Sequence, residues 1–223
     1  LTHLGNHGEA RKDLEEALAI YRKLGEGYGI TVCLLSLARS AVYAEDFDRC
    51  KTLSAEGLDT ARRLGFRTLV VDCLNQQGEA ARGLGDLQAA EDYYSQAIRG
   101  ARLLPNYPWV GILEGNLGLI LSQLERWAEA IAVFRDAQDS LHRNGAHVQE
   151  TLVATFLLPC IAGLDLWDEW SATYNEAVKK LEKIGAVEPD MAKSAYKAAQ
   201  IATATGRSEE ARQALGIAIS QWT

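Results

Sequence analysis

The stretch ARKDLEEALAIYRKLG, residues 10–25, returns in kind every 40 residues along the chain. The position of Ala17 stays small in each copy, as Gly57, Ala97, Ala137, Ala177 and, one residue late, Ala218. The position of Leu14 is bulky in most copies, as Tyr94, Phe134, Tyr174 and, one residue late, Leu215, with Ser54 as the exception. Self-similarity at this spacing is typical of a helical solenoid.

Each copy predicts one amphipathic helix, because small and bulky residues at offsets of three and four lie on one helical stripe. A second apolar-patterned helix precedes each copy, and a short turn such as Leu84-Gly85-Asp86 separates the two. Asp46 and Asp86 are suited to cap the helices that follow these turns. Glycine or proline recurs where each copy ends, at Gly25, Gly65, Pro105, Gly145 and Gly185. Each repeat is therefore predicted to be an antiparallel helical hairpin.

The series Gly85-Asp86, Ala90, Tyr94 and Ala97 resembles the tetratricopeptide repeat. Five or six copies in one register cover nearly the whole chain, although the family's ordinary unit is about 34 residues long. The resemblance implies an all-α fold, a right-handed α-solenoid of antiparallel helix pairs with about five and a half repeats. Long repeats of this kind resemble the sensor and scaffold arrays of bacterial signalling ATPases, transcriptional regulators and Ser/Thr kinases.

The domain prediction is a single array over residues 1–223. Position 5 matches the turn between the two helices of a repeat, so residues 1–25 are expected to be a partial repeat. Pro159 falls inside a predicted helix and should kink it. Because no polar cap is evident at either end, we expect a segment of a longer protein, with self-association possible through its ends. The complete repeats are placed near 29–65, 69–105, 109–145, 149–185 and 189–223.

Composition bears on the class of partner. The net charge is −7 with a pI near 5.2, and Lys and Arg are scattered, which makes nucleic acid an unfavourable partner. No run of eighteen apolar residues exists, and the first twenty residues are rich in charge. The four cysteines form no Cys-x-x-Cys pair and are interpreted as small core residues. We therefore expect a cytoplasmic protein without a membrane partner.

The search for chemistry predicts no enzyme, cofactor or metal site in this segment. The glycine-rich residues 25–29 lack the Lys-Ser/Thr of a phosphate-binding loop and are interpreted as a turn. His3 and His7 are interpreted as surface residues, and His142 and His147 as loop residues with no obvious carboxylate partner. An enzyme of unknown mechanism remains a third alternative, which would need a pocket of titratable residues with shifted pKa values.

The resemblance implies that the first helices of the repeats line a concave groove. The groove is expected to bind a helix or extended peptide of a partner, offering Lys or Arg to Asp72 and Glu79, with Tyr43 and Leu119 as anchors. The alternative is that a tightly wound superhelix buries this wall against itself. The groove residues with which chaperone-binding members of this family clamp a C-terminal carboxylate are missing from this sequence, so chaperone tails are disfavoured as partners. Projection of the columns opposite the core selects Val32, Leu35, Arg39, Tyr43, Asp72, Asn75, Glu79, Arg82, Ile112, Leu119, Gln123, Leu152 and Thr155.

Two function classes follow from these patterns. The first is a protein-protein interaction scaffold that binds a peptide or helix in the groove. The alternative is a regulatory or ligand-sensing module of a larger bacterial signalling protein. The two differ in what lies outside this segment, so a kinase or phosphate-binding loop elsewhere in the parent protein would favour the second.

Overall fold

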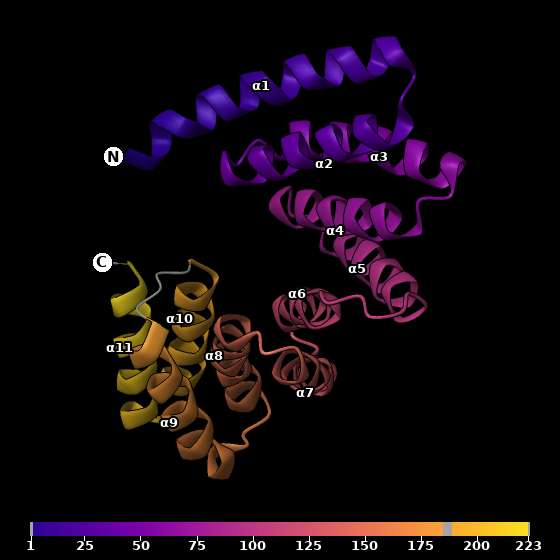
Figure 1. The fold of residues 1–223 in the computed structure, drawn as a ribbon. Helices are drawn as coiled ribbons and strands as arrows, with labels where there is room; N and C mark the ends of the chain where they lie inside the picture. The colour runs from indigo at the N-terminus through magenta and orange to yellow at the C-terminus, as the bar shows by residue number, and fades with distance from the viewer. Residues whose placement is uncertain (1, 185–188, 223) are drawn as a thin grey trace. The chain divides into compact units, whose positions relative to one another are not determined.

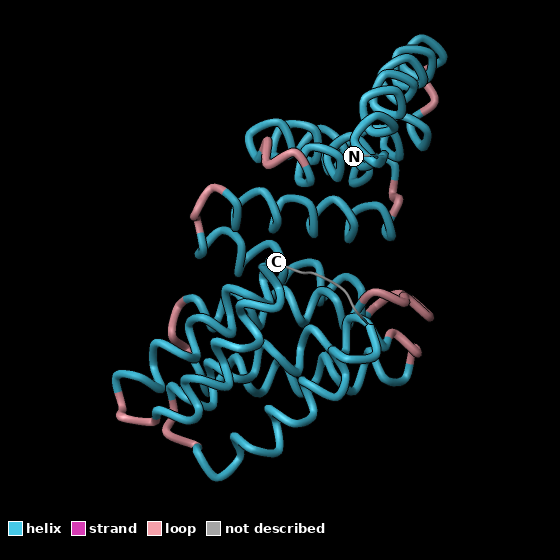
Figure 2. The backbone as a smooth tube through the Cα atoms, turned by 90° about the vertical axis from the view of Figure 1, so that its left-hand side faces the viewer, coloured by secondary structure: helices cyan, strands magenta, loops and turns pink. Residues whose placement is uncertain are grey.

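The computed structural model describes the backbone of residues 2–184 and 189–222, and the side chains of residues 9–183 and 189–221. Within these residues the chain is all helical, with short loops between helices and no strand (Figure 1, Figure 2). The predicted all-α class is thereby confirmed. The helices are α1 (Thr2–Leu24), α2 (Gly27–Tyr43), α3 (Phe47–Leu64), α4 (Arg67–Gly83), α5 (Leu87–Arg102), α6 (Val110–Gln123), α7 (Trp127–Arg143), α8 (His147–Gly163), α9 (Trp167–Ile184), α10 (Pro189–Ala204) and α11 (Ser208–Trp222).

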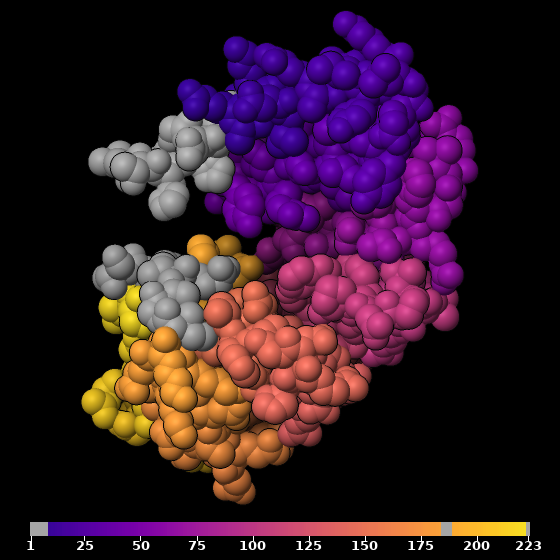
Figure 3. Space-filling view, viewed as in Figure 1, coloured from indigo at the N-terminus to yellow at the C-terminus, as the bar shows by residue number. Residues whose placement is uncertain are grey.

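The helices divide between two compact units, Leu1–Tyr107 and Pro108–Thr223. We call them unit 1, with α1 to α5, and unit 2, with α6 to α11. Within each unit, consecutive helices pack as antiparallel pairs, and the first helix of each pair also contacts the pair beside it, as α2 does α4 and α8 does α10. We call α2, α4, α6, α8 and α10 the A helices, and the odd-numbered helices the B helices. Side chains fill the space between the helices of a unit (Figure 3).

The turn inside each hairpin is set by local chemistry. Asp46 Oδ1 accepts a hydrogen bond from the Arg49 amide at 3.2 Å, and Asp86 Oδ1 accepts one from the Ala89 amide at 3.1 Å, so both predicted N-caps are confirmed. The residue before the cap position has a positive φ in five hairpins, one of them through Gly206 between α10 and α11. Glycine fills it without strain at Gly85, whereas Glu45, Glu125 and Asp165 are non-glycine residues in the left-handed region.

The turns between hairpins also follow the sequence. Gly65 and Gly145 have φ values of 75° and 66°, which end α3 and α7 in the left-handed conformation that glycine tolerates. Helix α5 ends at Arg102, before Pro105. Of the glycine-rich residues 25–29, only Gly25 and Glu26 form the predicted turn. Residues 27–29 are the first turn of α2, which the Glu26 carboxylate caps by accepting from the amides of Tyr28 and Gly29. Gly185 lies outside the described residues.

In the α4–α5 and α6–α7 hairpins, a large buried ring on the B helix faces a glycine on the A helix. Tyr94 of α5 and Phe134 of α7 are fully buried, and each ring lies over a glycine of the partner A helix, Gly78 or Gly118. A Cβ atom at either glycine would overlap the ring, so the aromatic residue requires the glycine. The pair therefore sets how closely the two helices approach in the α4–α5 and α6–α7 hairpins.

The structure bears on three further sequence-based expectations, at position 5, Leu215 and Pro159. No turn forms at position 5, because residues 2–24 are one helix. Leu215 is 38% exposed, while Ala214 is fully buried, so the bulky column is not displaced by one residue in α11. Pro159 is buried inside α8, which continues to Gly163.

Candidate partner-binding face

The predicted groove residues of α2 divide between surface and core. Val32, Arg39 and Tyr43 are exposed, and the Tyr43 side chain keeps 78% of its surface accessible. Leu35 is buried against the rest of unit 1. The exposed three lie on the A-helix side that the sequence projection selected, so α2 exposes two apolar side chains and one guanidinium there. We call this side of the A helices in either unit the A face.

On α4 the acidic residue Asp72 is already engaged within unit 1. Its Oδ1 accepts a hydrogen bond from the Tyr107 hydroxyl at 2.5 Å. Burial raises the pKa of the Asp72 carboxyl, and this outweighs the opposite effects of the Tyr107 hydrogen bond and the nearby Arg39 charge. The same contact, with burial as the larger cause, raises the pKa of the Tyr107 hydroxyl well above its usual range. A partner cation at Asp72 would therefore meet a carboxylate that already has a donor.

Glu79 is engaged in the same way. Its Oε2 forms an ion pair with Arg82 at 2.9 Å, and its Oε1 accepts a hydrogen bond from the Tyr94 hydroxyl at 2.9 Å. Asn75, Glu79 and Arg82 are all half-buried. The A face of α4 is thus a preorganised polar surface whose charges are largely satisfied inside unit 1.

In unit 2 the predicted groove residues are mostly apolar and less accessible. Leu119 and Thr155 are buried, Ile112 and Leu152 are half-buried, and Gln123 is exposed. Leu119 therefore lies in the core of unit 2 and offers a partner little surface of its own. Helix α8 lies between α6 and α10 (Figure 1).

A cavity of about 220 Å³ lies on this face between α6, α8 and α10. Leu119 and Pro159 form its apolar part, and Ser122 and Gln123 line it from α6. Helix α10 contributes four polar or charged residues, and two of them are lysines. The α10 residues are Asp190, Lys193, Ser194 and Lys197.

The sequence projection selected no residue of α10, so it missed the lysines that lie beside the columns of Ala192, Ala195 and Ala199. These alanines are buried, because small side chains let α10 approach α8 closely. Lys193 and Lys197 lie one or two residues from those columns. Their separation of four residues, which puts both on one helical face, was the available signal.

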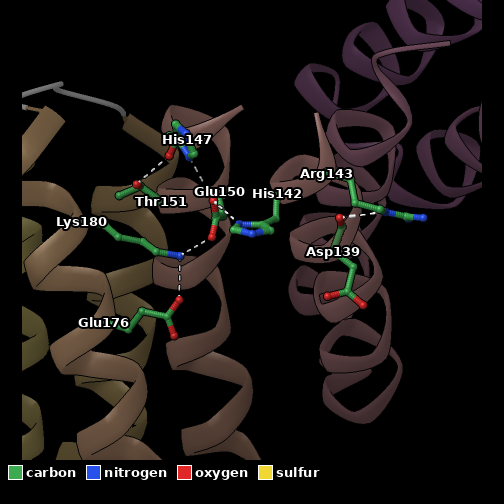
Figure 4. Close-up of polar contacts among 8 residues, drawn as sticks. All are labelled: Asp139, His142, Arg143, His147, Glu150, Thr151, Glu176 and Lys180. Atoms are coloured by element: carbon green, nitrogen blue, oxygen red, sulfur yellow. Dashed lines mark hydrogen bonds and ion pairs between the residues drawn. The ribbon is translucent and has the colours of Figure 1, made fainter. Parts of the chain in front are cut away.

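A second polar cluster joins the end of α7 to α8 and α9 (Figure 4). Glu150 Oε1 pairs with Lys180 Nζ at 2.8 Å, and Lys180 Nζ also pairs with Glu176 Oε1 at 2.7 Å. Glu150 Oε2 lies 3.5 Å from His147 Nδ1 and 3.7 Å from His142 Nδ1. The expectation that these histidines have no carboxylate partner is therefore wrong, since Glu150 lies between them.

Electrostatics explain how the half-buried carboxylate of Glu150 stays charged. Burial by itself would raise its pKa, but the hydrogen bond and charge of Lys180, together with the two histidines, lower the pKa below its ordinary value. Burial would also lower the pKa of Lys180, and its bonds to Glu150 and Glu176 raise it instead. The cluster therefore favours ions in both partners and fastens α8 to α9.

Other chemistry is sparse in the part of the chain that the structure describes. No group of His, Cys, Asp and Glu side chains there could hold a metal ion, and the side chains of His3 and His7 lie outside it. The four thiols are buried, and burial raises the pKa of Cys73 to about 12 and those of Cys50 and Cys160 to about 11. Such thiols are poor nucleophiles. None of the described helices is long and apolar enough to cross a membrane.

Comparison with known proteins supports the repeat type. Tetratricopeptide-repeat family models match residues 69–141 and 1–24, whereas no curated protein matches the sequence. Three solved structures resemble the fold at low sequence identity, which makes the likeness one of fold alone.

The first of these is BtubC (BKLC) from P. vanneervenii, with a TM-score of 0.73, 16% identity, and coverage of 97% of this chain and 91% of that one. The second is a Rap protein complexed with competence and sporulation factor, with a TM-score of 0.73, 12% identity, and coverage of 99% and 71%. The third is a STAND signal-transduction ATPase with a tetratricopeptide repeat sensor from Pyrococcus horikoshii, with a TM-score of 0.74, 15% identity, and coverage of 99% and 34%.

Proposed function

We propose that this chain, which is built from repeats of the tetratricopeptide type, binds a peptide or helix of a partner protein on the A faces of its units. The coarser conclusion, an interaction or regulatory module, rests on the fold and the family models. The observation that carries the finer proposal is the exposure of Val32, Arg39 and Tyr43 on α2 beside a packed core. Large exposed apolar side chains next to satisfied polar groups are suited to docking.

The partner chemistry differs from the sequence-based expectation in one respect. A partner Lys or Arg at Asp72 or Glu79 would have to compete with Tyr107, Tyr94 and Arg82. We therefore propose that unit 1 anchors a partner mainly through apolar contact with Tyr43 and Val32, while the α4 charges fix orientation. A buried aromatic anchor surrounded by satisfied polar groups is a common arrangement in interfaces.

A random 12-residue peptide library displayed on phage tests the proposal. The purified chain should enrich a peptide family, and a synthetic member should bind measurably by fluorescence anisotropy. Tyr43→Ser should weaken that binding about tenfold, since hot-spot truncations cost more than about 1 kcal/mol. Ile20→Ser on the B helix α1 is the matched control, because Ile20 is 57% exposed and should leave binding unchanged. Failure to enrich any peptide, or equal effects of both variants, would contradict the proposal.

The second candidate is a regulatory or sensing module within a larger signalling protein in the cytoplasm. The likeness to an array described as the sensor of a signal-transduction ATPase favours it. Sequencing the parent reading frame tests this, because a kinase or phosphate-binding loop beside the array supports regulation and its absence supports a free-standing scaffold. Self-association through the ends belongs to the same proposal, and sedimentation measurements over a range of concentrations would detect it.

A further inference from the structure

We infer that the cavity between α6, α8 and α10 takes an acidic side chain of a bound peptide, an Asp or Glu flanked by apolar residues. This inference rests on the proposed function and specifies its ligand for unit 2. The cavity measures about 220 Å³, which is below the range of roughly 300–1,000 Å³ typical of pockets that enclose a whole small ligand. It therefore suits one or two side chains of a ligand that lies mostly outside it.

The charges around the cavity favour an anion. Among the residues that the structure describes, its lining carries the ammonium groups of Lys193 and Lys197 and one carboxylate, that of Asp190. Asp190 Oδ1 lies 3.5 Å from Lys193 Nζ, so it offsets one of the two cations. The lining itself thus carries one more cation than anion in a chain with a net charge of −7, and the carboxylate that balances it is that of Glu125, which pairs with Lys197 from outside the lining.

Lys197 is held in position by its surroundings. Its Nζ pairs with Glu125 Oε1 at 2.8 Å, and it lies 6.0 Å from the centroid of the Trp127 ring. An ammonium group has three donors, so one ion pair leaves room for a ligand carboxylate. The pair with Glu125 is itself exchangeable, because its side chains are 42% and 62% exposed and exposed ion pairs contribute little.

The neighbouring surface decides what must flank the acidic group. Leu119 and Pro159 provide apolar contact at the base, and Ser194 and Gln123 provide donors beside the lysines. A carboxylate on a flexible side chain can reach the ammonium groups while adjacent apolar residues cover Leu119 and Pro159. A peptide with an acidic residue between apolar ones therefore fits this lining better than a basic or wholly apolar one.

Glu125 makes the inference testable in both directions. Its carboxylate occupies Lys197 from within the chain and so competes with a ligand carboxylate. Removing the charge of Glu125 should strengthen peptide binding, whereas removing the charge of Lys197 should weaken it. A purely structural role for either residue would not produce opposite signs.

The experiment starts from the peptides enriched on the wild-type chain from the displayed 12-residue library. We expect an Asp or Glu next to apolar residues among them. One such peptide is synthesised with an amidated C-terminus, together with a copy in which the acidic residue is replaced by its amide, so that the side chain is the carboxylate under test. Anisotropy should show about fivefold weaker binding of the amide copy to the wild-type chain.

The variants complete the test. Lys193→Gln and Lys197→Gln should each weaken binding of the acidic peptide by about three- to fivefold and leave binding of the amide copy nearly unchanged. Glu125→Gln should tighten binding of the acidic peptide about twofold. Lys179→Gln on α9 is the control, since it changes the net charge equally at an exposed position outside the cavity. Thermal melting of each variant checks that it is folded.

The outcomes separate the two proposals. If no peptide is enriched, the proposed function itself fails. If peptides bind but show no acidic preference, or if Lys179→Gln weakens binding as much as Lys197→Gln, the inference about the cavity is overturned while the proposed function stands. Binding that requires a free C-terminus also overturns it.

Discussion

Tyr94 in unit 1 and Phe134 in unit 2 occupy the same position of the 40-residue register, and so do Glu79 and Leu119 on the partner A helices. In unit 1 the buried Tyr94 hydroxyl donates to Glu79, which pairs with Arg82 on the A face. In unit 2 both Phe134 and Leu119 belong to one apolar core cluster. The polar pair in one unit corresponds to an apolar pair in the other.

This difference shows how the core of a unit affects the chemistry of its A face. The aromatic ring has the same packing role in both hairpins, over Gly78 or Gly118. The Tyr94 hydroxyl lies inside the hairpin and donates a hydrogen bond to Glu79, whose carboxylate lies on the A face. The chemistry of the A face is therefore set partly by residues buried inside the hairpin.

The largest effect is expected where the shared packing is removed. Phe134→Ala should lower the free energy of unfolding by about 3–5 kcal/mol, because the fully buried ring leaves a cavity over Gly118. Urea unfolding monitored by circular dichroism measures the loss. A loss below about 1 kcal/mol would show that the hairpin closes around the gap and that the ring does not set the helix spacing.

The glycine beneath the ring gives the next largest effect. Gly118→Ala should lower the free energy of unfolding by about 1–3 kcal/mol, because the added Cβ overlaps Phe134. Gly115→Ala on the same helix is the control, since its Cβ would lie at an ordinary 3.5 Å from Val153 Cγ2. That variant should gain about 0.5–1 kcal/mol through helix propensity. Equal effects of the two substitutions would contradict the size matching.

The two units differ by the hydroxyl group of Tyr94, and substitutions can remove it from unit 1 or add it to unit 2. Tyr94→Phe should cost about 1–2 kcal/mol, because Glu79 loses a donor inside the hairpin. Phe134→Tyr should cost a similar amount, because it places a hydroxyl in an apolar core beside Leu119. Urea unfolding of both variants checks this. A neutral result for both would mean that the difference between the units has no energetic consequence.

The smallest effects are expected from pH, and they have opposite signs in the two units. The pKa of Asp72 is raised by burial from 3.8, so its contribution to stability is fully present below that value and is lost as pH rises through the higher folded-state pKa. The pKa of Glu150 is lowered from 4.5 despite burial, because Lys180 outweighs it. Its contribution is present above 4.5 and is lost as pH falls through the lower folded-state pKa.

Two isosteric variants separate these contributions. Relative to the wild type, Asp72→Asn should be most favourable near pH 7 and lose that advantage on acidification, whereas the cost of Glu150→Gln should be greatest near pH 7 and shrink on acidification. Unfolding free energies measured from pH 3 to 7 test both trends. Parallel pH dependence of the two variants would contradict the assignment of opposite shifts.

Much of the hairpin architecture could be predicted from single positions. The caps at Asp46 and Asp86 and the left-handed glycines at Gly65 and Gly145 depend on chemistry within one turn of the chain. The prediction that failed at His142 concerns a contact between two helices. His142 of α7 reaches the Glu150 carboxylate of α8 because the two helices fold back on each other.

Sequence reasoning was limited in the same way at the candidate site. The projection selected α2 residues that are exposed, but it also selected Leu119 and Thr155, which are buried, and it passed over Lys193 and Lys197. Exposure on a helix face depends on how closely the neighbouring helix approaches. That distance is set by the sizes of both partners, as the buried alanines of α10 against α8 demonstrate.

The sequence by itself determined the helical repeat, its turns and the small and bulky columns of the core, because helix periodicity and capping act over a few residues. Only the tertiary structure decided which charges are already paired, as at Asp72 and Glu79, and where lysines gather beside a cavity. The reason is physical: ion pairs and cavities depend on distances between side chains of different helices, and those distances follow from packing across the whole unit.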